Sequence, residues 1–345
     1  MRFLVTGATG FIGGALAQKL AARGHSVRAL VRRHTDASLL ESMGVEVVRG
    51  DLLDRGSLEK AVDGVEGVFH AAAIYAYWSK DPAELYRVNA GGTAALFGAA
   101  KQAGVRRAVY TSTVATLNWP GKGRLADESS IARLDDLPGH YKRSKFLGEQ
   151  SALELGGNGF DVVVVNPTAP FGPGDSRPTP TGRIIVEFLR RRYPGYVNTG
   201  LNVCDVDDVA EGHVAAFERG RAGERYILGG ANVTLREVYD TLGRVTGLRR
   251  RPVRVPWLLA YAAGVVDSIY AGAIRGREPY VPVEGLRVAR HPMYVDCAKA
   301  TRELGLKVRP VEETLGRAAR WHMMRLGMKL PAGDGGKRSA SGVAS

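Results

Sequence analysis

Three glycines near the N-terminus constrain this chain more than any other feature of its sequence. Gly7, Gly10 and Gly13 follow an apolar run at Phe3–Thr6. They open a helical pattern over Gly10–Arg23. Glycine permits a tight turn and a close approach of the backbone to a pyrophosphate, and the helix that follows offers free N–H groups to the phosphates. The segment therefore predicts a strand, a phosphate-binding turn and a helix.

The first half of the chain continues this alternation of short apolar runs and helical patterns. Such alternation predicts an α/β fold, a Rossmann-type doubly wound parallel sheet with helices on both faces. The further predicted strands are His25–Val31, Val45–Arg49, Val65–His70, Ala108–Thr111 and Asp161–Asn166, and helical stretches lie near 57–63, 83–103 and 139–156.

The character of the chain changes after Asn166. The stretch Pro167–Pro180 carries five prolines, which favours a loop-rich crossing into a smaller C-terminal substrate-binding region. The segments Gly200–Val209 and Glu224–Gly229 are expected as strands that return to the main sheet. We therefore predict a dinucleotide-binding domain over 1–167 with returning segments near 200–229, a substrate-binding region over 168–199 and 230–330, and a disordered tail over 331–345.

Composition indicates the setting in which the protein works. Cys204 and Cys297 are the two cysteines, and neither lies in a metal-binding or disulfide pattern, so we expect no metal site and a reducing, cytoplasmic location. The N-terminus lacks the basic start of a signal peptide. The longest apolar stretch, Pro256–Ile274, contains Asp267, which disfavours a membrane-spanning helix.

The formal net charge is +13, with a marked excess of arginine and lysine over 241–310. No nucleic-acid-binding motif accompanies this charge, so we expect a small-molecule substrate and no nucleic-acid partner. Two interpretations stay open for Pro256–Ile274 and its basic flanks Arg249–Arg254 and Arg275–Arg277. The stretch is either a helix packed within the substrate region or a peripheral contact with a membrane surface.

Arginines at the end of the second predicted strand bear on the choice of cofactor. Arg32 and Arg33 stand where a carboxylate would bind the ribose of NAD. A guanidinium there can pair with a 2′-phosphate, so NADP is favoured, while Asp36 keeps NAD open. Asp51, after the third strand, is placed either to accept from the adenine amine or to cap a helix.

A tyrosine and a lysine four residues apart suggest acid–base chemistry. Tyr141 and Lys145 share one helical face, and a nearby ammonium would lower the pKa of the Tyr141 phenol toward neutral pH. The hydroxyl cluster that ends at Thr113 closes a predicted strand, where ligands bind in such sheets. A hydroxyl there can share the charge that develops on a reacting oxygen. Taken singly, these residues are also typical of an amphipathic pair and of a helix cap.

Together these motifs resemble the extended short-chain dehydrogenase/reductase family. The resemblance also covers an Asn-x-x-Gly-Thr segment at Asn89 and the segment Asn166–Thr168. It implies catalysis by Thr113, Tyr141 and Lys145, with Thr113 preferred to Ser112 because the family's hydroxyl residue directly precedes the loop. The implied cofactor-binding residues are Gly7, Thr9, Gly10, Phe11, Ile12, Gly13, Arg32, Arg33, Asp51, Leu52, Ala71, Ala72, Ala73, Tyr141, Lys145, Pro167 and Thr168.

Two further segments, His140–Leu147 and Pro178–Ile185, are similar to a subgroup of hopanoid-associated sugar epimerases, often labelled similar to dihydroflavonol 4-reductase. The chain departs from the family at 116–118, where Thr-Leu-Asn replaces the usual Val-Tyr-Gly. The resemblance also implies a homodimer, in which the helical stretches 83–103 and 139–156 pair across a two-fold axis.

Three functions remain open on the sequence. The leading one is hydride transfer between NAD(P) and a secondary alcohol or ketone of a sugar-like or hopanoid-linked substrate, as in an epimerase. The second is an NADPH-dependent ketone reductase of the dihydroflavonol-reductase type. The third, a non-catalytic cofactor-sensing protein, is disfavoured because such proteins usually lose the tyrosine or the lysine, and Tyr141 and Lys145 are both present.

Overall fold

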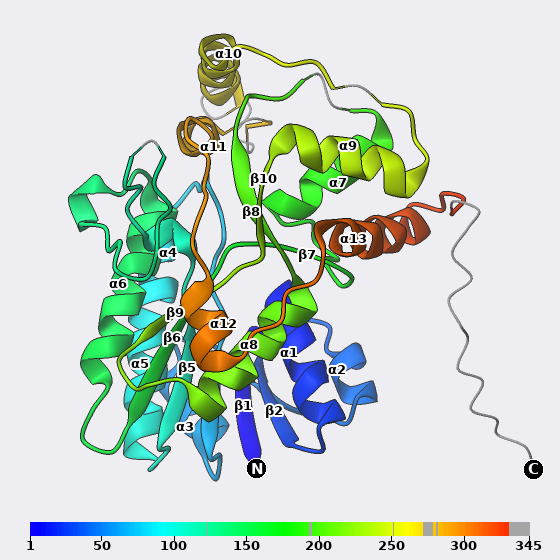
Figure 1. Cartoon of the computed structure of the whole chain (residues 1–345). Coiled ribbons are helices and arrows are strands. Elements are labelled where there is room, and N and C mark those ends of the chain that lie inside the picture. The colour runs from blue at the N-terminus through cyan, green and yellow to red at the C-terminus, as the bar shows by residue number, and fades with distance from the viewer. Residues whose placement is uncertain (122, 193–194, 251, 272–278, 281, 331–345) are drawn as a thin grey trace, which may run out of the picture.

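A seven-stranded sheet, parallel throughout, forms the centre of the molecule (Figure 1). The computed structural model describes residues 1–121, 123–192, 195–250, 252–271, 279–280 and 282–330. The strand order is β3-β2-β1-β4-β5-β6-β9, and every neighbouring pair is parallel. The expected doubly wound α/β fold is thereby confirmed. The strands are β1 (Arg2–Thr6), β2 (Ser26–Val31), β3 (Glu46–Arg49), β4 (Gly67–His70), β5 (Arg107–Thr111), β6 (Asp161–Pro167) and β9 (Arg225–Leu228).

Helices cover both faces of this sheet because its central strands are apolar on both sides. Four consecutive valines in β6, for example, are buried alternately against one helical layer and the other. One layer contains α1 (Phe11–Ala22), α8 (Val206–Arg219) and α12 (Ala298–Leu304), and the other contains α3 (Arg55–Val62), α5 (Gly92–Gln102) and α6 (His140–Leu155). The short helices α2 (Ser38–Ser42) and α4 (Pro82–Tyr86) lie within the connections that follow β2 and β4.

A smaller region sits beyond the carboxyl edge of the main sheet (Figure 1). Its three-stranded sheet has the order β10-β8-β7, and a separate apolar core joins it to three helices. Two more helices, α10 and α11, stand at the top of the molecule in Figure 1. The elements are β7 (Ala169–Phe171), β8 (Gly200–Asp205), β10 (Ala231–Thr234), α7 (Pro180–Arg190), α9 (Leu235–Thr246), α13 (Val311–Arg325), α10 (Trp257–Ile269) and α11 (Val283–Val288).

The structure corrects the expected strand at Gly200–Val209. Strand β8 ends at Asp205, whose carboxylate accepts from the Asp207 N–H and caps α8. Moreover, β8 pairs with β7 and β10 in the smaller sheet and does not return to the main one. Within 200–229 the parts that return are α8, which packs on α1, and β9, which pairs with β6. Helix α12 returns as well and packs on α8 and β9, so it does not belong to the smaller region that was expected over 230–330.

Two further differences concern connections. The expected loop over Pro167–Pro180 contains the short strand β7. The helical stretch 83–103 is broken into α4, a π-helical turn at Arg87–Gly91 and α5. The expected tail, 331–345, lies outside the described residues. Among the described residues, no helix has the length and apolar character needed to cross a bilayer.

Candidate active site

The glycine turn brings the start of α1 to the carboxyl edge of the main sheet. Gly7 has φ +73°, and a Cβ there would lie 2.7 Å from the Ala72 nitrogen. A Cβ on Gly13 would lie 2.2 Å from the Gly7 carbonyl oxygen, and the Gly10 N–H donates to that same oxygen at 2.8 Å. Only glycine fits these positions, so the turn can hold the N-terminal amides of α1 open to a phosphate.

A buried histidine at the end of β4 contacts the residue that directly precedes the glycine turn. His70, at the end of β4, contacts Thr6 Oγ1 through Nδ1 at 2.6 Å and Thr93 Oγ1 through Nε2 at 2.9 Å. Burial lowers the pKa of His70 to about 3, so the ring is neutral at physiological pH. Thr6 Oγ1 also accepts from the Ala72 N–H at 3.3 Å, which fixes the segment Ala71–Ala73 beside Gly7. Sequence reasoning missed His70 because only its position at a strand end distinguished it.

The expected cofactor-selecting residues lie at the open end of β2. Arg32 and Arg33 are both exposed there, directly after the strand. The Asp36 carboxylate, which kept NAD open, accepts from the Ser38 N–H at the start of α2. The exposed Asp51 carboxylate likewise accepts from the Leu53 N–H at 2.9 Å in a turn. The cap of α3 is Asp54 and not Asp51, so the helix-cap alternative for Asp51 is wrong. Leu52 is buried.

Tyr141 and Lys145 project from the first two turns of α6 toward the end of β5. Both side chains are buried, with 7% and 3% of their surfaces exposed. Lys145 Nζ donates to the Tyr110 hydroxyl at 2.9 Å and to the Thr111 carbonyl at 2.8 Å. Burial lowers the pKa of Lys145 to about 7, and the neighbouring Glu149 carboxylate opposes that effect.

The structure brings Thr113 to Tyr141 and corrects the expected phenol acidity. Burial raises the pKa of Tyr141 well above its usual value, and a hydrogen bond with Thr113 lowers it by less. The Lys145 ammonium is directed instead at Tyr110 and Thr111. The protein by itself therefore keeps the Tyr141 hydroxyl protonated at neutral pH. Thr113 Oγ1 also accepts from the Ala115 N–H at 3.2 Å, which fixes its rotamer.

A buried carboxylate behind this constellation was not foreseen from the sequence. Glu149, one turn after Lys145, accepts from the hydroxyls of Ser112 and Thr116. Asn166 Nδ2 lies 3.3 Å from the same oxygen and 3.1 Å from the Thr113 carbonyl, to which it donates. Arg225 of β9 pairs with the other carboxylate oxygen. The network fixes the strand-end loop that carries Thr113.

Aromatic side chains form a wall beside Tyr141. The Tyr75 ring centroid lies 4.7 Å from that of Tyr141, and the Tyr77 ring lies 6.0 Å away in an edge-on arrangement. Asn89, in the π-helical turn, holds the segment that carries both rings. Its side chain exchanges hydrogen bonds with the Ile74 backbone at 2.8 and 3.0 Å and donates to Ser144 on α6 at 3.0 Å.

The remaining expected residues lie where β6 ends. Pro167 pairs with Leu228 of β9, and the Thr168 N–H donates to the Leu228 carbonyl at 3.2 Å. Thr168 Oγ1 donates to Cys204 Sγ at 3.2 Å. The segment is thus fixed at the same edge of the sheet as the end of β5. Thr9, Phe11 and Ile12 belong to the glycine turn and the start of α1.

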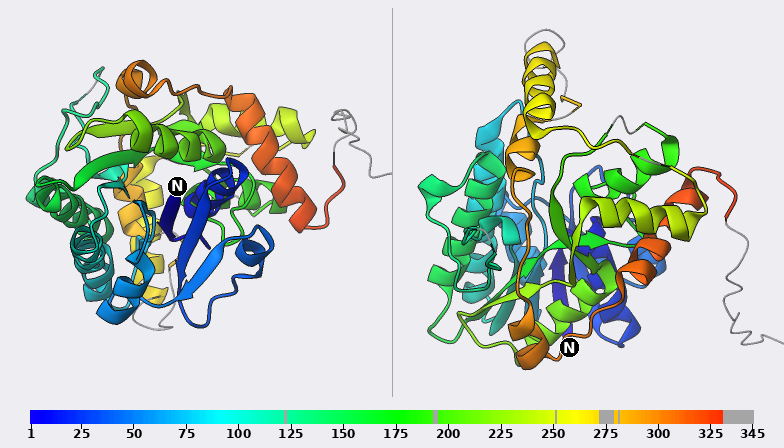
Figure 2. Two further views of the ribbon diagram at one scale, coloured as in Figure 1. Left: turned by 90° about the horizontal axis from the view of Figure 1, so that it is seen from below. Right: turned by 45° about the horizontal axis from the view of Figure 1, so that its top comes forward.

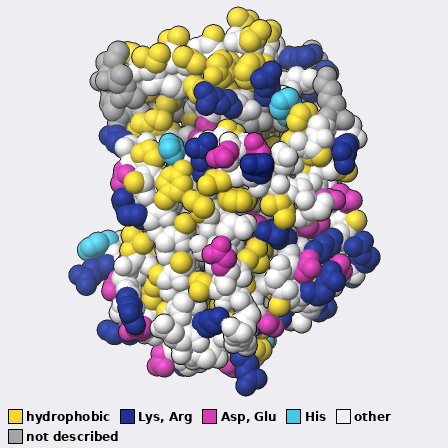
Figure 3. Space-filling model, turned by 90° about the vertical axis from the view of Figure 1, so that its left-hand side faces the viewer, with side chains coloured by type: hydrophobic (Ala, Val, Ile, Leu, Met, Phe, Trp, Pro, Cys, Tyr) yellow, Lys and Arg dark blue, Asp and Glu magenta, His cyan; other side chains and the backbone are white. Residues whose placement is uncertain are grey.

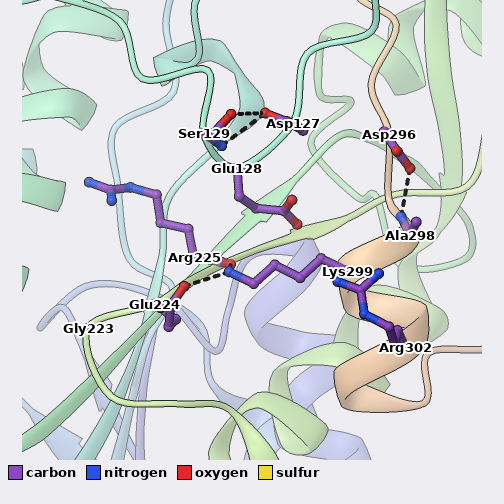
Figure 4. Close-up of a pocket in the computed structure, with 10 residues that line it drawn as sticks. All are labelled: Asp127, Glu128, Ser129, Gly223, Glu224, Arg225, Asp296, Ala298, Lys299 and Arg302. Carbon is purple, nitrogen blue, oxygen red and sulfur yellow. Dashed lines mark hydrogen bonds and ion pairs between the residues drawn. The ribbon is translucent and has the colours of Figure 1, made fainter.

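A separate polar hollow of about 490 Å³ opens between the loop at 127–129, the start of β9 and α12 (Figure 4). None of the three expected catalytic residues lines it. Lys299 Nζ donates to the Glu224 carboxylate and the Arg225 carbonyl, each at 2.7 Å. Glu128 accepts from the Ile227 N–H at 2.9 Å. These internal pairings use the polar groups of the hollow to join β9 and α12.

The chain is similar in sequence to a known enzyme family and to several of its members. Residues 3–229 match the model of the NAD dependent epimerase/dehydratase family. A putative dihydroflavonol 4-reductase of Synechocystis sp. is 44% identical over 324 residues, which cover 92% of this chain and 94% of that protein. Sterol demethylase protein B of Methylococcus capsulatus is 33% identical over 327 residues, covering 94% and 99%.

Solved structures show the same architecture. The crystal structure of a nucleoside-diphosphate-sugar epimerase from Pseudomonas aeruginosa superposes with a TM-score of 0.80 at 26% identity, covering 95% of this chain and 99% of that one. The similarity extends through the smaller region as well as the main sheet, because nearly the whole of both chains is covered.

Proposed function

Because the chain belongs to the NAD-dependent epimerase/dehydratase family and is an NAD(P)-dependent enzyme of the extended short-chain dehydrogenase/reductase type, we propose that it reduces a ketone on a large, mainly apolar substrate with NADPH. The observation that carries this proposal is the wall formed by Tyr75 and Tyr77 beside Tyr141. Aromatic faces favour an apolar ring system next to the reacting carbon. The similarity to proteins named for a sterol and for a flavonol supports the same substrate class.

The glycine turn fits the cofactor. Side chains at Gly7 and Gly13 would collide with the backbone of Ala72 and of Gly7, so these two glycines permit the tight turn that leads into α1. The N-terminus of α1 would then stabilise the charge of a pyrophosphate. Lys145 uses two of its three N–H donors on Tyr110 and Thr111, so the third can bind a ribose hydroxyl. Exposed Arg32 and Arg33 would pair with the 2′-phosphate of NADP.

The chain's own residues would handle the carbonyl oxygen. NADPH, when bound, would supply the hydride for the carbonyl carbon. The hydroxyls of Thr113 and Tyr141 would bind the carbonyl oxygen beforehand, and the Tyr141 O–H bond would break as its proton passes to that oxygen. A Tyr141 hydroxyl whose pKa is raised by burial holds this proton at neutral pH, which suits reduction. The hydrogen bond from Thr113 favours the phenolate that forms, whereas Lys145 is directed at Tyr110 and Thr111.

A sugar epimerase is the second candidate, and a specific observation favours it. Glu284 of α11 lies against Gly139, directly before α6, and its Oε1 is buried with no hydrogen-bond partner among the described residues. Burial raises the pKa of this carboxyl to about 7. Such a group could bind a substrate hydroxyl. The similarity to a nucleoside-diphosphate-sugar epimerase points the same way.

The decisive experiment identifies the cofactor that co-purifies, by mass spectrometry, and follows NADPH absorbance with sterol-type, flavanone-type and nucleotide-sugar substrates. We expect NADPH to be consumed in proportion to an apolar cyclic ketone. Tightly held NAD that survives many turnovers of an isomerised sugar would establish the epimerase instead. Failure of every substrate, with tight cofactor binding that is unchanged in Tyr141→Phe, would favour a cofactor sensor.

We also propose that the enzyme works in the cytoplasm as a homodimer. Cys204 and Cys297 are both free thiols, in keeping with a reducing compartment. Helices α5 and α6 lie side by side at one edge of the molecule, where a two-fold axis would join four helices (Figure 1).

A further inference from the structure

Helix α10 turns an apolar face to solvent. Its exposed residues recur at helical spacing on one side, and all of them are apolar. Leu258 is 73% exposed and Val266 is 67% exposed, far more than a packed helix would leave. The helix stands out from the rest of the molecule (Figure 2, right). The face comprises Leu258, Leu259, Ala262, Ala263, Val266 and Ile269.

The opposite side of α10 fixes this orientation. Trp257 Nε1 donates to the Leu286 carbonyl of α11 at 2.8 Å, and the Trp257 ring stacks on Tyr261 with centroids 4.8 Å apart. Arg287 Nη2 reaches the Tyr261 hydroxyl at 3.4 Å. Because the aromatic side is held against α11, the apolar side is presented outward as part of the fold.

Basic side chains border this face. Arg254 is exposed just before α10, and Arg287 and Arg290 are exposed on and beside α11. The Arg290 guanidinium lies 5.3 Å from the Trp257 ring centre. In Figure 3, hydrophobic side chains cover the top of the molecule, and lysine or arginine side chains lie just beneath them. An apolar face above a basic rim matches a bilayer with anionic headgroups over its acyl chains.

We propose that the α10 face docks on the surface of an anionic lipid bilayer, with its apolar side chains between the headgroups and the arginines against the lipid phosphates. The described part of the helix, Trp257–Ile269, has 13 residues, fewer than the about 20 that a bilayer span needs. We therefore place the helix in the plane of the interface. This docking is independent of whether the enzyme is a reductase or an epimerase.

A second copy of the chain is a poorer occupant of the same face. A two-fold contact through α10 would bring Arg254, Arg287 and Arg290 of each copy toward the same residues of the other. Like charges across an interface oppose association, whereas an anionic bilayer neutralises them.

The test is flotation of the full-length protein with vesicles of phosphatidylcholine alone or of phosphatidylcholine and phosphatidylglycerol in equal parts. We expect binding to the mixed vesicles, weakened by salt. The triple variant Leu258→Gln/Leu259→Gln/Val266→Gln should bind at least about tenfold less, because glutamine keeps the helix but removes apolar area. Arg254→Gln/Arg287→Gln/Arg290→Gln should lose the preference for mixed vesicles.

A matched control replaces exposed leucines elsewhere. Leu39 on α2 and Leu53 are 72% and 53% exposed, and Leu39→Gln/Leu53→Gln should bind vesicles like the wild type. Circular dichroism and a thermal melt check that each variant is folded. Equal flotation of wild type and α10 variant would overturn the proposal. So would an α10 variant that changes only the oligomeric state by sedimentation, because a second copy would then be the occupant.

Discussion

The Glu149 carboxylate of α6 pairs with Arg225 of β9 and joins the helix of the candidate active site to the edge strand of the main sheet. Both groups are largely buried. Removing one partner leaves a buried charge uncompensated, so Glu149→Gln should lower the free energy of unfolding by about 3 kcal/mol. Urea denaturation measures this loss. Adding Arg225→Met should recover part of it, and a double variant no more stable than Glu149→Gln would contradict the pairing.

Tyr141→Phe tests the proposed proton donor. Loss of a general acid should reduce turnover by at least about 10²-fold, roughly 3 kcal/mol in the barrier, while the cofactor dissociation constant stays close to that of the wild type. Tyr86→Phe is the matched control, since its hydroxyl contacts the exposed His140 and not the strand-end loop. Steady-state assays and cofactor titration give both quantities. Unchanged turnover in Tyr141→Phe would remove this residue from the mechanism.

Cofactor choice should depend on the arginines at the end of β2. We expect the wild type to bind NADP more tightly than NAD by about ten- to a hundredfold, since a charged hydrogen bond contributes about 1.5–3 kcal/mol. Arg32→Ala/Arg33→Ala should abolish this preference. Arg55→Ala, at an exposed site on α3, should leave it intact. Calorimetric titration with NADP and NAD measures both dissociation constants. Equal affinities of the wild type for the two cofactors would show that Arg32 and Arg33 do not select NADP.

Lys145 should make stability depend on pH. Its pKa is about 7 in the folded protein and about 10.4 when unfolded. Between these values the unfolded chain holds a proton that the folded one has released, so stability rises with pH, by up to about 1.4 kcal/mol per pH unit. Below pH 7 both states are protonated and this contribution is absent. Lys145→Met should flatten the rise in urea titrations, whereas Lys60→Met, at an exposed lysine, should not.

The proposed dimer can be tested on α5. Ala95 is exposed there, and a glutamate at this position would place like charges across a two-fold helix bundle. We expect the wild type to sediment as a dimer at micromolar concentration and Ala95→Glu to sediment as a monomer. Gln102→Glu, at the exposed end of the same helix, is the control. A monomeric wild type would contradict the proposal.

The central sheet could be predicted from the sequence because its inner strands, such as β4, β5 and β6, are buried on both faces and consist mainly of apolar residues. The glycine turn could also be predicted from the sequence, because only glycine permits the backbone conformation at Gly7 and the close backbone contact at Gly13. Strand β7 was missed because it has three residues and includes Pro170. The end of β8 was misplaced because apolar residues flank Asp205 on both sides through 203–206, across the junction with α8, and the capping hydrogen bond of Asp205 is visible only in three dimensions.

In the candidate site, too, local sequence patterns predicted some residues, and only the three-dimensional structure revealed others. Tyr141 and Lys145 share a helix, so their spacing alone placed them together. Glu149 was not recognised because its partners come from the loop after β5, from β6 and from β9, far from it in the sequence. The raised pKa of Tyr141 could not be foreseen either. It depends on burial and on the direction taken by the Lys145 amino group, which only packing determines.

The path of the chain between the two sheets limits how such an enzyme can change. After β6 the backbone passes to the smaller sheet for β7 and β8, and it returns to the main sheet for α8 and β9. It then goes back to the smaller region for β10 and α9, packs α12 on the main sheet, and returns to the smaller region for α13. Exchange of one continuous segment would therefore not replace the whole substrate region with that of a relative. A new specificity is more readily reached by substitutions and loop insertions within this region, which leave the cofactor-binding part of the chain unchanged.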